Sequence, residues 1–298
     1  MEGKLVTFYT SDNLELHGYL VGNPEDSSGV VLHVHGLGGN FYKSSFISSM
    51  TKNYLDIGLS FLTFNNRGHD FVTRIKNKDR ESIWSGYSFE NFSKTHLDLL
   101  AAYNFVKENG WRTIYFQGHS SGTQKIIYTI NKEKIDLGGI ILISPCDDWG
   151  LITKKLGDRV LTTLRSKYKK MPLNKIIQEK FMYEKPLTKT SFLSHFDVDS
   201  SFNIFHYSQP QKSFLELNRI TFPTLVIFGE NDYVENLESA KKILVDNIQT
   251  EISFKIIPGA DHNYYLKEEI LTKEITFWIK NLPNRNQASK AESNWRSD

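Results

Sequence analysis

Residues 113–123 read TIYFQGHSSGT, and this stretch decides the fold that the rest of the chain must adopt. The apolar, aromatic run at 114–116 is typical of a buried strand, and residues 124–130 can continue as a helix. A G-x-S-x-G between a strand and a helix requires a sharp reversal, and its two glycines leave room for the close approach. The turn lifts the Ser120 hydroxyl above the end of a sheet, beside the positive end of a helix. We therefore hypothesise that Ser120 is a nucleophile.

The pentapeptide alone is a weak signal. With glycine and serine each at about 7% of residues, a chain of this length contains one by chance on the order of one time in ten. An ordinary glycine-rich turn capped by serine is the competing interpretation, and only further sites in the right order can overcome it.

Length and composition indicate one large α/β domain, or one domain with a sizeable insertion, since 298 residues with 39% hydrophobic content can form a packed core. The formal charge of +2 favours neither nucleic acid nor a membrane as partner. The single cysteine, Cys146, excludes an internal disulfide framework. The N-terminal stretch is charged, unlike a signal peptide, and no run of about 18 apolar residues occurs, so we expect a cytoplasmic protein.

Strand-like and helix-like segments alternate along most of the chain. Buried, strand-like runs lie at 30–34, 59–64, 114–116, 139–145, 224–228 and 252–257, after a hairpin-like pair at 4–9 and 14–21. Helical spacing occurs at 44–57, 89–109, 124–130 and 267–279. The alternation predicts an α/β fold with a mostly parallel central sheet and helices on both faces.

Residues 147–219 break this alternation because they contain no convincing buried strand. The following residues are spaced like one helix face: Leu156, Val160, Leu161, Leu164 and Tyr168. We predict a helical cap or lid, inserted into a core made of residues 1–146 and 220–283 and followed by a polar tail at 284–298. Residues 151–185 hold ten Lys or Arg against three Asp or Glu; such a run is most often a solvated helix face, and a guide for an anionic substrate is the minority interpretation.

A serine hydroxyl needs a general base, and the base needs an orienting carboxylate. In open α/β sheets such groups come from loops beyond the carboxyl ends of strands. Asp232 follows the predicted strand at 224–228, and His262 follows the one at 252–257. The chain order serine, aspartate, histidine is the one expected for a serine on a strand–turn–helix elbow.

Four motifs in this order resemble the α/β-hydrolase superfamily along nearly the whole chain. They are HG at 35–36, GHSSG at 118–122, GENDYV at 229–234 and GADH at 259–262. The resemblance implies that Ser120 is the nucleophile, Asp232 the acid and His262 the general base. It also implies an oxyanion hole formed by the backbone N–H groups of Leu37 and Ser121. Residues 65–69 resemble the family's R-G-x-G loop, in which Asp70 replaces the second glycine.

Other carboxylates and histidines compete for these roles. Glu230 lies close to Asp232, and Asp147 or Asp148 after the preceding strand is the fallback acid. The pair His33 and His35 could suggest a metal site, but no further ligand stands out at matching spacing, and we expect no metal. We interpret His33 as a core residue and His35 as shaping the oxyanion loop.

Four further residues are expected to have no chemical role. His119 inside the elbow is interpreted as a packing residue. Cys146 is interpreted as a small buried residue, since a nucleophilic role would leave the Ser120 elbow unexplained. His195 and His206 could line the pocket, although solvated surface positions are the main expectation.

The resemblance and the residues together indicate a serine hydrolase that cleaves a carboxylic ester or thioester through an acyl-enzyme. An acyltransferase, a lactonase or a peptidase would use the same three residues, so these alternatives stay open. A different class of protein, a non-catalytic receptor for a small ligand, could also retain them. We expect a small acyl substrate, no cofactor, and neither nucleic acid nor membrane as partner; the oligomeric state is not indicated.

Overall fold

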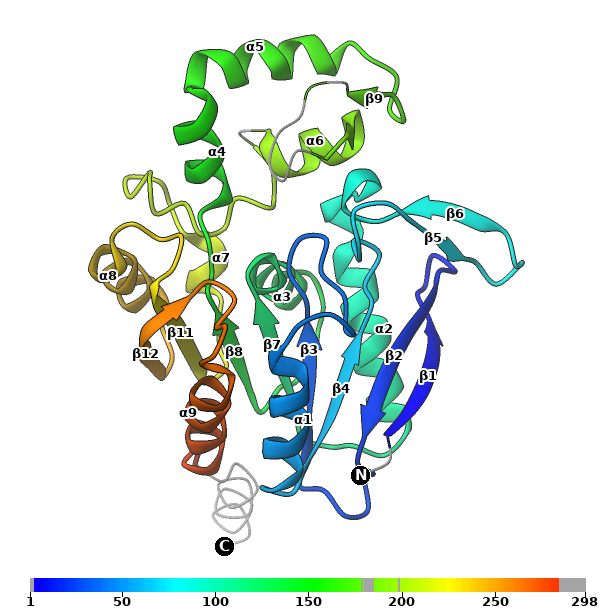
Figure 1. Ribbon diagram of the computed structural model, residues 1–298, viewed down its shortest axis with the longest axis vertical. Helices are drawn as coiled ribbons and strands as arrows, with labels where there is room; N and C mark the ends of the chain where they lie inside the picture. The colour runs from blue at the N-terminus through cyan, green and yellow to red at the C-terminus, as the bar shows by residue number, and fades with distance from the viewer. Residues whose placement is uncertain (1–2, 178, 180–184, 198, 284–298) are drawn as a thin grey trace, which may run out of the picture.

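The structure, a computed structural model, describes residues 3–177, 179, 185–197 and 199–283. The strands of its central sheet are β1 (Gly3–Tyr9), β2 (Glu15–Val21), β3 (Gly29–Val34), β4 (Leu59–Phe64), β7 (Ile114–His119), β8 (Gly139–Ile143), β11 (Thr224–Asn231) and β12 (Ile252–Asp261). They are ordered β1-β2-β4-β3-β7-β8-β11-β12 (Figure 1). Strands β1 and β2 pair antiparallel, as do β2 and β4, and the remaining pairs are parallel. The predicted, mostly parallel sheet is confirmed.

Helices cover both faces of this sheet. The helices α1 (Phe46–Leu55) and α9 (Glu268–Lys280) pack on one face, and α2 (Thr95–Glu108), α3 (Ser121–Lys132) and α8 (Leu237–Asn247) pack on the other. Successive strand residues serve opposite faces: Val31 belongs to the apolar cluster of α1 and α9, whereas Val30 and Leu32 belong to that of α2, α3 and α8. The strands therefore consist of continuous apolar runs, as expected for a sheet buried on both sides.

Two predicted helices differ from the structure. The helix predicted at 89–109 begins only at Thr95, because two short 3₁₀ turns, η1 (Tyr87–Phe89) and η2 (Phe92–Lys94), precede α2. The single helix face predicted for residues 156–168 is wrong. Helices α4 (Asp148–Leu156) and α5 (Asp158–Lys169) are separated by Gly157 at φ 82°, a conformation that suits glycine, and Val160 is 47% exposed. The hairpin of β5 (Thr73–Lys76) and β6 (Ser82–Ser85) was not predicted, nor was helix α8.

The insertion that begins after β8 lies beyond the carboxyl ends of the central strands (Figure 1). It contains α4, α5, the two-residue strands β9 (Ile176–Ile177) and β10 (Leu187–Thr188), and α6 (Lys189–Phe196). The chain then returns to the sheet through α7 (Leu215–Asn218), which packs against α3 and α8. An apolar cluster of its own holds α4, α5 and α6 together, formed by residues such as Trp149, Ile152, Leu161, Tyr168, Phe192 and Phe196. The division at 147 and 219 stays a prediction, and the predicted tail at 284–298 lies outside the described residues. No helix in the described part of the chain is long and apolar enough to cross a membrane.

Candidate active site

Ser120 occupies the junction between β7 and α3 in a strained conformation, with φ 54° and ψ −127°. Its backbone N–H donates to Ile143 O of β8 at 2.9 Å, which ties the turn to the neighbouring strand. The flanking glycines are required by contact. A Cβ on Gly122 would lie 2.1 Å from Val34 O, and one on Gly118 would lie 2.6 Å from the Gly122 carbonyl. The steric reason predicted for both glycines is confirmed.

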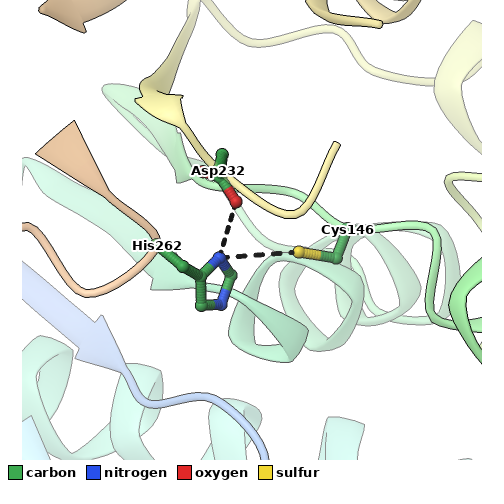
Figure 2. A group of neighbouring side chains, drawn as sticks. All are labelled: Cys146, Asp232 and His262. Atoms are coloured by element: carbon green, nitrogen blue, oxygen red, sulfur yellow. Dashed lines mark hydrogen bonds and ion pairs between the residues drawn. The ribbon is translucent and has the colours of Figure 1, made fainter. Parts of the chain in front are cut away.

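Asp232 and His262 meet because they follow neighbouring parallel strands, β11 and β12. His262 Nδ1 donates to Asp232 Oδ1 at 2.7 Å, and Figure 2 shows the ring turned toward the carboxylate. Asp232 is further held by the Tyr233 backbone N–H at 2.7 Å and by the Ser144 hydroxyl, which itself contacts the Tyr264 hydroxyl at 2.8 Å. The carboxylate therefore has a fixed orientation toward the imidazole.

The electrostatics of this pair suit a carboxylate that orients a base. Burial alone would raise the pKa of Asp232, but the hydrogen bond and charge of His262, together with the Ser144 hydroxyl, hold that pKa below its ordinary value. Asp232 therefore stays ionised. Because its carboxylate accepts the hydrogen bond from the Nδ1–H group of His262, Nε2 is the nitrogen left to accept a proton.

Ser120 and His262 both reach the thiol of Cys146. The Sγ atom lies 3.8 Å from His262 Nδ1. Burial, followed by the charges of nearby carboxylates, raises the pKa of the thiol well above its ordinary value, and a hydrogen bond with the Ser120 side chain offsets part of this increase. His119, next to Ser120, donates from Nε2 to His262 O at 2.8 Å and packs edge-on against Phe46. The structure thus gathers Ser120, Asp232 and His262 at one edge of the sheet.

The loop after β3 approaches Ser120 from the other side. A Cβ on Gly36 would lie 2.9 Å from Ser120 Cβ, so the backbone of this loop packs directly against the serine. His35 shapes this loop by donating from Nδ1 to Gly36 O at 2.9 Å and by accepting the Asn66 N–H at Nε2. The Ser121 N–H lies in the first turn of α3, where amides have no acceptor within the helix. The role of the Leu37 and Ser121 amides as an oxyanion hole stays a prediction.

The competing acids are occupied elsewhere. Glu230 is exposed and accepts the Gly259 N–H at 2.7 Å. Asp147 caps α4 through Gly150 N–H and also accepts Ser208 N–H, both at 2.7 Å. Asp148 is buried and accepts from the Gln124 amide at 2.7 Å; burial, followed by the charge of Asp147, raises its pKa to about 6.

The loop at residues 65–70 packs against the loop after β3 through the hydrogen bond from Asn66 N–H to His35. Arg67 bridges Asp98 at 2.7 Å and Asp12 at 3.0 Å, and its own N–H also donates to Asp98. Asp70, which stands where the family pattern has glycine, adopts φ 55° and binds the side chains of Asn40, Tyr42 and Lys43. An aspartate tolerates this left-handed conformation, so the loop keeps its shape without the glycine.

Sequence reasoning missed two members of the site and misplaced two histidines. Cys146 is buried as expected but lies within the site, and the Tyr233 ring stacks on His262 with centroids 4.2 Å apart. Their positions directly after a predicted strand and next to Asp232 were the available signals. The expectation that His195 and His206 are solvated is wrong: both are buried, His195 against the rings of Phe92 and Phe202, and His206 stacked on Phe214.

A cavity of about 250 Å³ opens beside Cys146 and Tyr233, two of the residues that contact the His262 ring. Its other walls come from α4 and from the loops after β11 and before α7, and include Leu151, Lys154, Tyr207, Val234 and Glu235. The Lys154 ammonium and the Glu235 carboxylate form an ion pair between two of these walls. The cavity therefore adjoins the candidate active site through Cys146 and Tyr233, while Ser120 and His262 are not among its lining residues.

The parallel sheet, the strained serine turn and the buried aspartate–histidine pair together define an α/β-hydrolase. Solved structures share this fold. Est1E from Butyrivibrio proteoclasticus, with ferulic acid bound, has a TM-score of 0.66 at 17% identity, over 93% of this chain and 99% of that one. The esterase Pf2001 of Pyrococcus furiosus has a TM-score of 0.62 at 19% identity, over 95% and 92% of the two chains. The siderophore hydrolase EstB of Aspergillus fumigatus has a TM-score of 0.67 at 15% identity, over 94% and 98%.

The sequence also matches the model of one protein family. The model of the family described as serine aminopeptidase, S33, matches residues 25–269, and the chain belongs to this family. A search of curated proteins gives no match. The protein is therefore an enzyme of the α/β-hydrolase type.

Proposed function

We propose that the protein is a serine hydrolase that cleaves a small-to-medium carboxylic ester or thioester through an acyl-enzyme. The observation that carries this proposal is the His262 ring, held at Nδ1 by the ionised Asp232 beside the elbow that presents Ser120. A serine nucleophile needs a base that accepts its proton and a carboxylate that orients this base.

In the proposed reaction, the Ser120 hydroxyl attacks the substrate carbonyl while Nε2 of His262 takes its proton. The tetrahedral oxyanion accepts hydrogen bonds from the N–H groups of Leu37 and Ser121, and losing one such donor typically costs about 3–4 kcal/mol. His262 then returns the proton to the leaving alcohol or thiol. A water molecule, activated by the same base, releases the acid and restores Ser120.

The cavity supports a compact substrate. Its volume of about 250 Å³ is at or below the small end of the usual range for ligand pockets, roughly 300–1,000 Å³. Leu151, Tyr207 and Tyr233 give it apolar and aromatic walls, which suit an acyl or alcohol group of moderate size. The similar structure of Est1E binds ferulic acid, an aromatic acid, so an aromatic acyl group is a reasonable member of a substrate panel.

The same cavity favours an ester over the free N-terminus of a peptide. An aminopeptidase needs a carboxylate to hold the substrate's ammonium group. Of the residues that line the cavity, Asp147 already accepts two backbone N–H groups, and Glu235 is paired with Lys154. The cavity therefore offers no uncommitted anion for an ammonium group, whereas an uncharged ester requires none.

Labelling with a fluorophosphonate probe tests the proposal directly. The folded protein should be labelled at Ser120, and labelling should be absent in Ser120→Ala and in heat-unfolded protein, while Ser48→Ala on the exposed face of α1 remains labelled. Short p-nitrophenyl esters should turn over and aminoacyl p-nitroanilides should not. Tight ligand binding without labelling or turnover would instead indicate the non-catalytic receptor, and preferred anilide cleavage would indicate a peptidase.

A further inference from the structure

Three side chains of the candidate active site, those of Cys146, Asp232 and His262, are also arranged as ligands of a metal ion could be. The Cys146 Sγ atom, a carboxylate oxygen of Asp232 and Nδ1 of His262 all lie within 4.8 Å of one another, and Figure 2 shows them converging. Thiolate, imidazole and carboxylate are the three ligand types that Zn²⁺ takes in proteins. The hydrolytic reaction proposed above uses two of these groups and leaves the thiol unused.

The distances between these atoms are close to those of a tetrahedral site. With Zn–S near 2.3 Å and Zn–N near 2.0 Å, a tetrahedral angle separates sulfur from nitrogen by about 3.6 Å. The observed distance from Cys146 Sγ to His262 Nδ1 is 3.8 Å. The oxygen-to-nitrogen distance of the same geometry is about 3.3 Å, whereas Asp232 Oδ1 lies 2.7 Å from Nδ1. The carboxylate therefore has to withdraw by only about 0.6 Å when a cation replaces the shared proton.

A cation has both an entry path and a favourable potential. Cys146 lines the cavity of about 250 Å³, so an ion can reach the thiol from that side. Two carboxylates lie at this place, since the Asp232 side chain is buried against His262 and Asp148 is buried against Gln124. A coordinating thiol is deprotonated by the metal itself, so a thiol that is neutral without the ion can still serve as a ligand.

We propose that Cys146, Asp232 and His262 form a binding site for a thiophilic divalent cation of the zinc class, and that the bound cation inhibits the enzyme. Binding releases the thiol proton and leaves the imidazole neutral. Because the cation occupies Nδ1, the remaining ring proton moves to Nε2, the nitrogen that must accept the Ser120 proton. The inhibitory part rests on the proposed hydrolase function; the binding part does not.

Spectroscopic titration tests the binding part. Adding Cd²⁺ or Co²⁺ to the full chain should produce a thiolate-to-metal charge-transfer band that saturates at one equivalent. Cys146 is the single cysteine of the chain, so this band can report on no other residue. It should be absent in Cys146→Ala. A wild-type protein that shows no band at saturating Cd²⁺ overturns the proposal.

Inhibition of p-nitrophenyl ester hydrolysis tests the second part, with each variant compared with its own metal-free rate. Zn²⁺ should inhibit the wild type and EDTA should restore the rate, whereas Mg²⁺ and Ca²⁺, which prefer oxygen ligands, should have no effect. In Cys146→Ala the half-inhibitory concentration should rise by about 100-fold, because losing a ligand costs at least as much as losing a partner that only orients one, which costs roughly 10- to 100-fold. The control His17→Ala removes an exposed histidine–glutamate pair and should keep wild-type sensitivity.

Equal Zn²⁺ sensitivity in Cys146→Ala and the wild type overturns the inhibitory site. A saturating charge-transfer band in a protein that hydrolyses no ester and reacts with no fluorophosphonate supports the metal site while refuting the proposed function. The two proposals therefore fail in distinguishable ways.

Discussion

Among the carboxylate–histidine pairs in the described part of the chain, two that lie near the nucleophile helix α3 have different surroundings. Asp232 and His262 meet at 2.7 Å at the edge of the sheet, beside Ser120 and the cavity. Glu90 and His195 approach to 3.4 Å, and both side chains are fully buried. Glu90 also binds the buried ammonium of Lys125 at 2.6 Å. The same two residue types thus occupy two unlike environments.

The second pair joins parts of the fold instead of facing a substrate. Lys125 belongs to α3 and also donates to Asn66 of the loop at residues 65–70 at 3.0 Å, while the Ser194 hydroxyl of α6 donates to Glu90 O at 3.2 Å. Glu90 therefore links the elbow helix to the insertion. A carboxylate–histidine pair can act as a catalytic base only where a hydroxyl group and a cavity lie next to it. Next to the Glu90–His195 pair lies the ammonium group of Lys125 instead.

Removing the carboxylate from each pair should give the largest contrast in turnover. Asp232→Asn should lower kcat for an ester substrate by about 10⁴-fold, because the amide cannot accept the Nδ1 proton and fixes the wrong tautomer. Glu90→Gln should stay within tenfold of the wild type, since Glu90 is remote from the reacting atoms. Steady-state kinetics on folded protein checks this, and equal losses in both variants would contradict the distinction between the pairs.

Stability should show the reverse order. Glu90→Gln leaves the buried Lys125 ammonium without its anion, and breaking a buried pair in this way costs about 3–5 kcal/mol of the free energy of unfolding. Adding Lys125→Met removes the stranded charge and should recover most of the loss. Urea unfolding at pH 7 measures both, and additive losses in the double variant would contradict the coupling.

The acid dependence of the same pair has a defined sign. Burial raises the pKa of Glu90, but the charges of Lys125 and His195 lower that pKa to about 2 overall, below the ordinary 4.5. The contribution of Glu90 to stability is therefore present above pH 4.5 and lost as the pH falls toward 2. Glu90→Gln should lack this loss, so its unfolding free energy should approach that of the wild type at low pH.

Asp148 is a third buried carboxylate, and the histidines of both pairs act on its charge. Asp148 feels the charges of both His262 and His195, yet burial and the nearby Asp147 raise its pKa to about 6. The protonated form is favoured in the fold, so this contribution to stability is full below pH 3.8 and lost as the pH rises through 6. Asp148→Asn should therefore gain on the wild type by about 2 kcal/mol between pH 4 and pH 7. Unfolding curves that stay parallel across this range would show that Asp148 is not perturbed.

The contrast also explains how much could be predicted from sequence. The residues 120, 232 and 262 follow predicted strands, and parallel strands end at one edge of a sheet, so their order and spacing indicated a common location. The Glu90–Lys125–His195 cluster could not be found in this way. Its members lie in a turn, in a helix and in the insertion, and only the packing of α6 against η1 and η2 brings them together. Cys146 and Tyr233 adjoin predicted positions, but their contacts with the ring depend on side-chain directions that periodicity does not determine.

Of these substitutions, removing the Tyr233 ring that stacks on His262 should have the smallest effect, which is expected on kcat/KM. Tyr233 lies 4.2 Å from the imidazole at an interplanar angle of 23° and is 48% exposed, so it restricts the ring on the side that faces the cavity. Aromatic pairs of this kind contribute about 0.5–1.5 kcal/mol, which corresponds to roughly 2- to 10-fold in kcat/KM for Tyr233→Leu. Tyr265→Leu is a matched control, because Tyr265 is 66% exposed in the turn that follows β12. A loss confined to KM would place Tyr233 in the substrate wall, whereas a loss in kcat would show that the stacking holds the base in position.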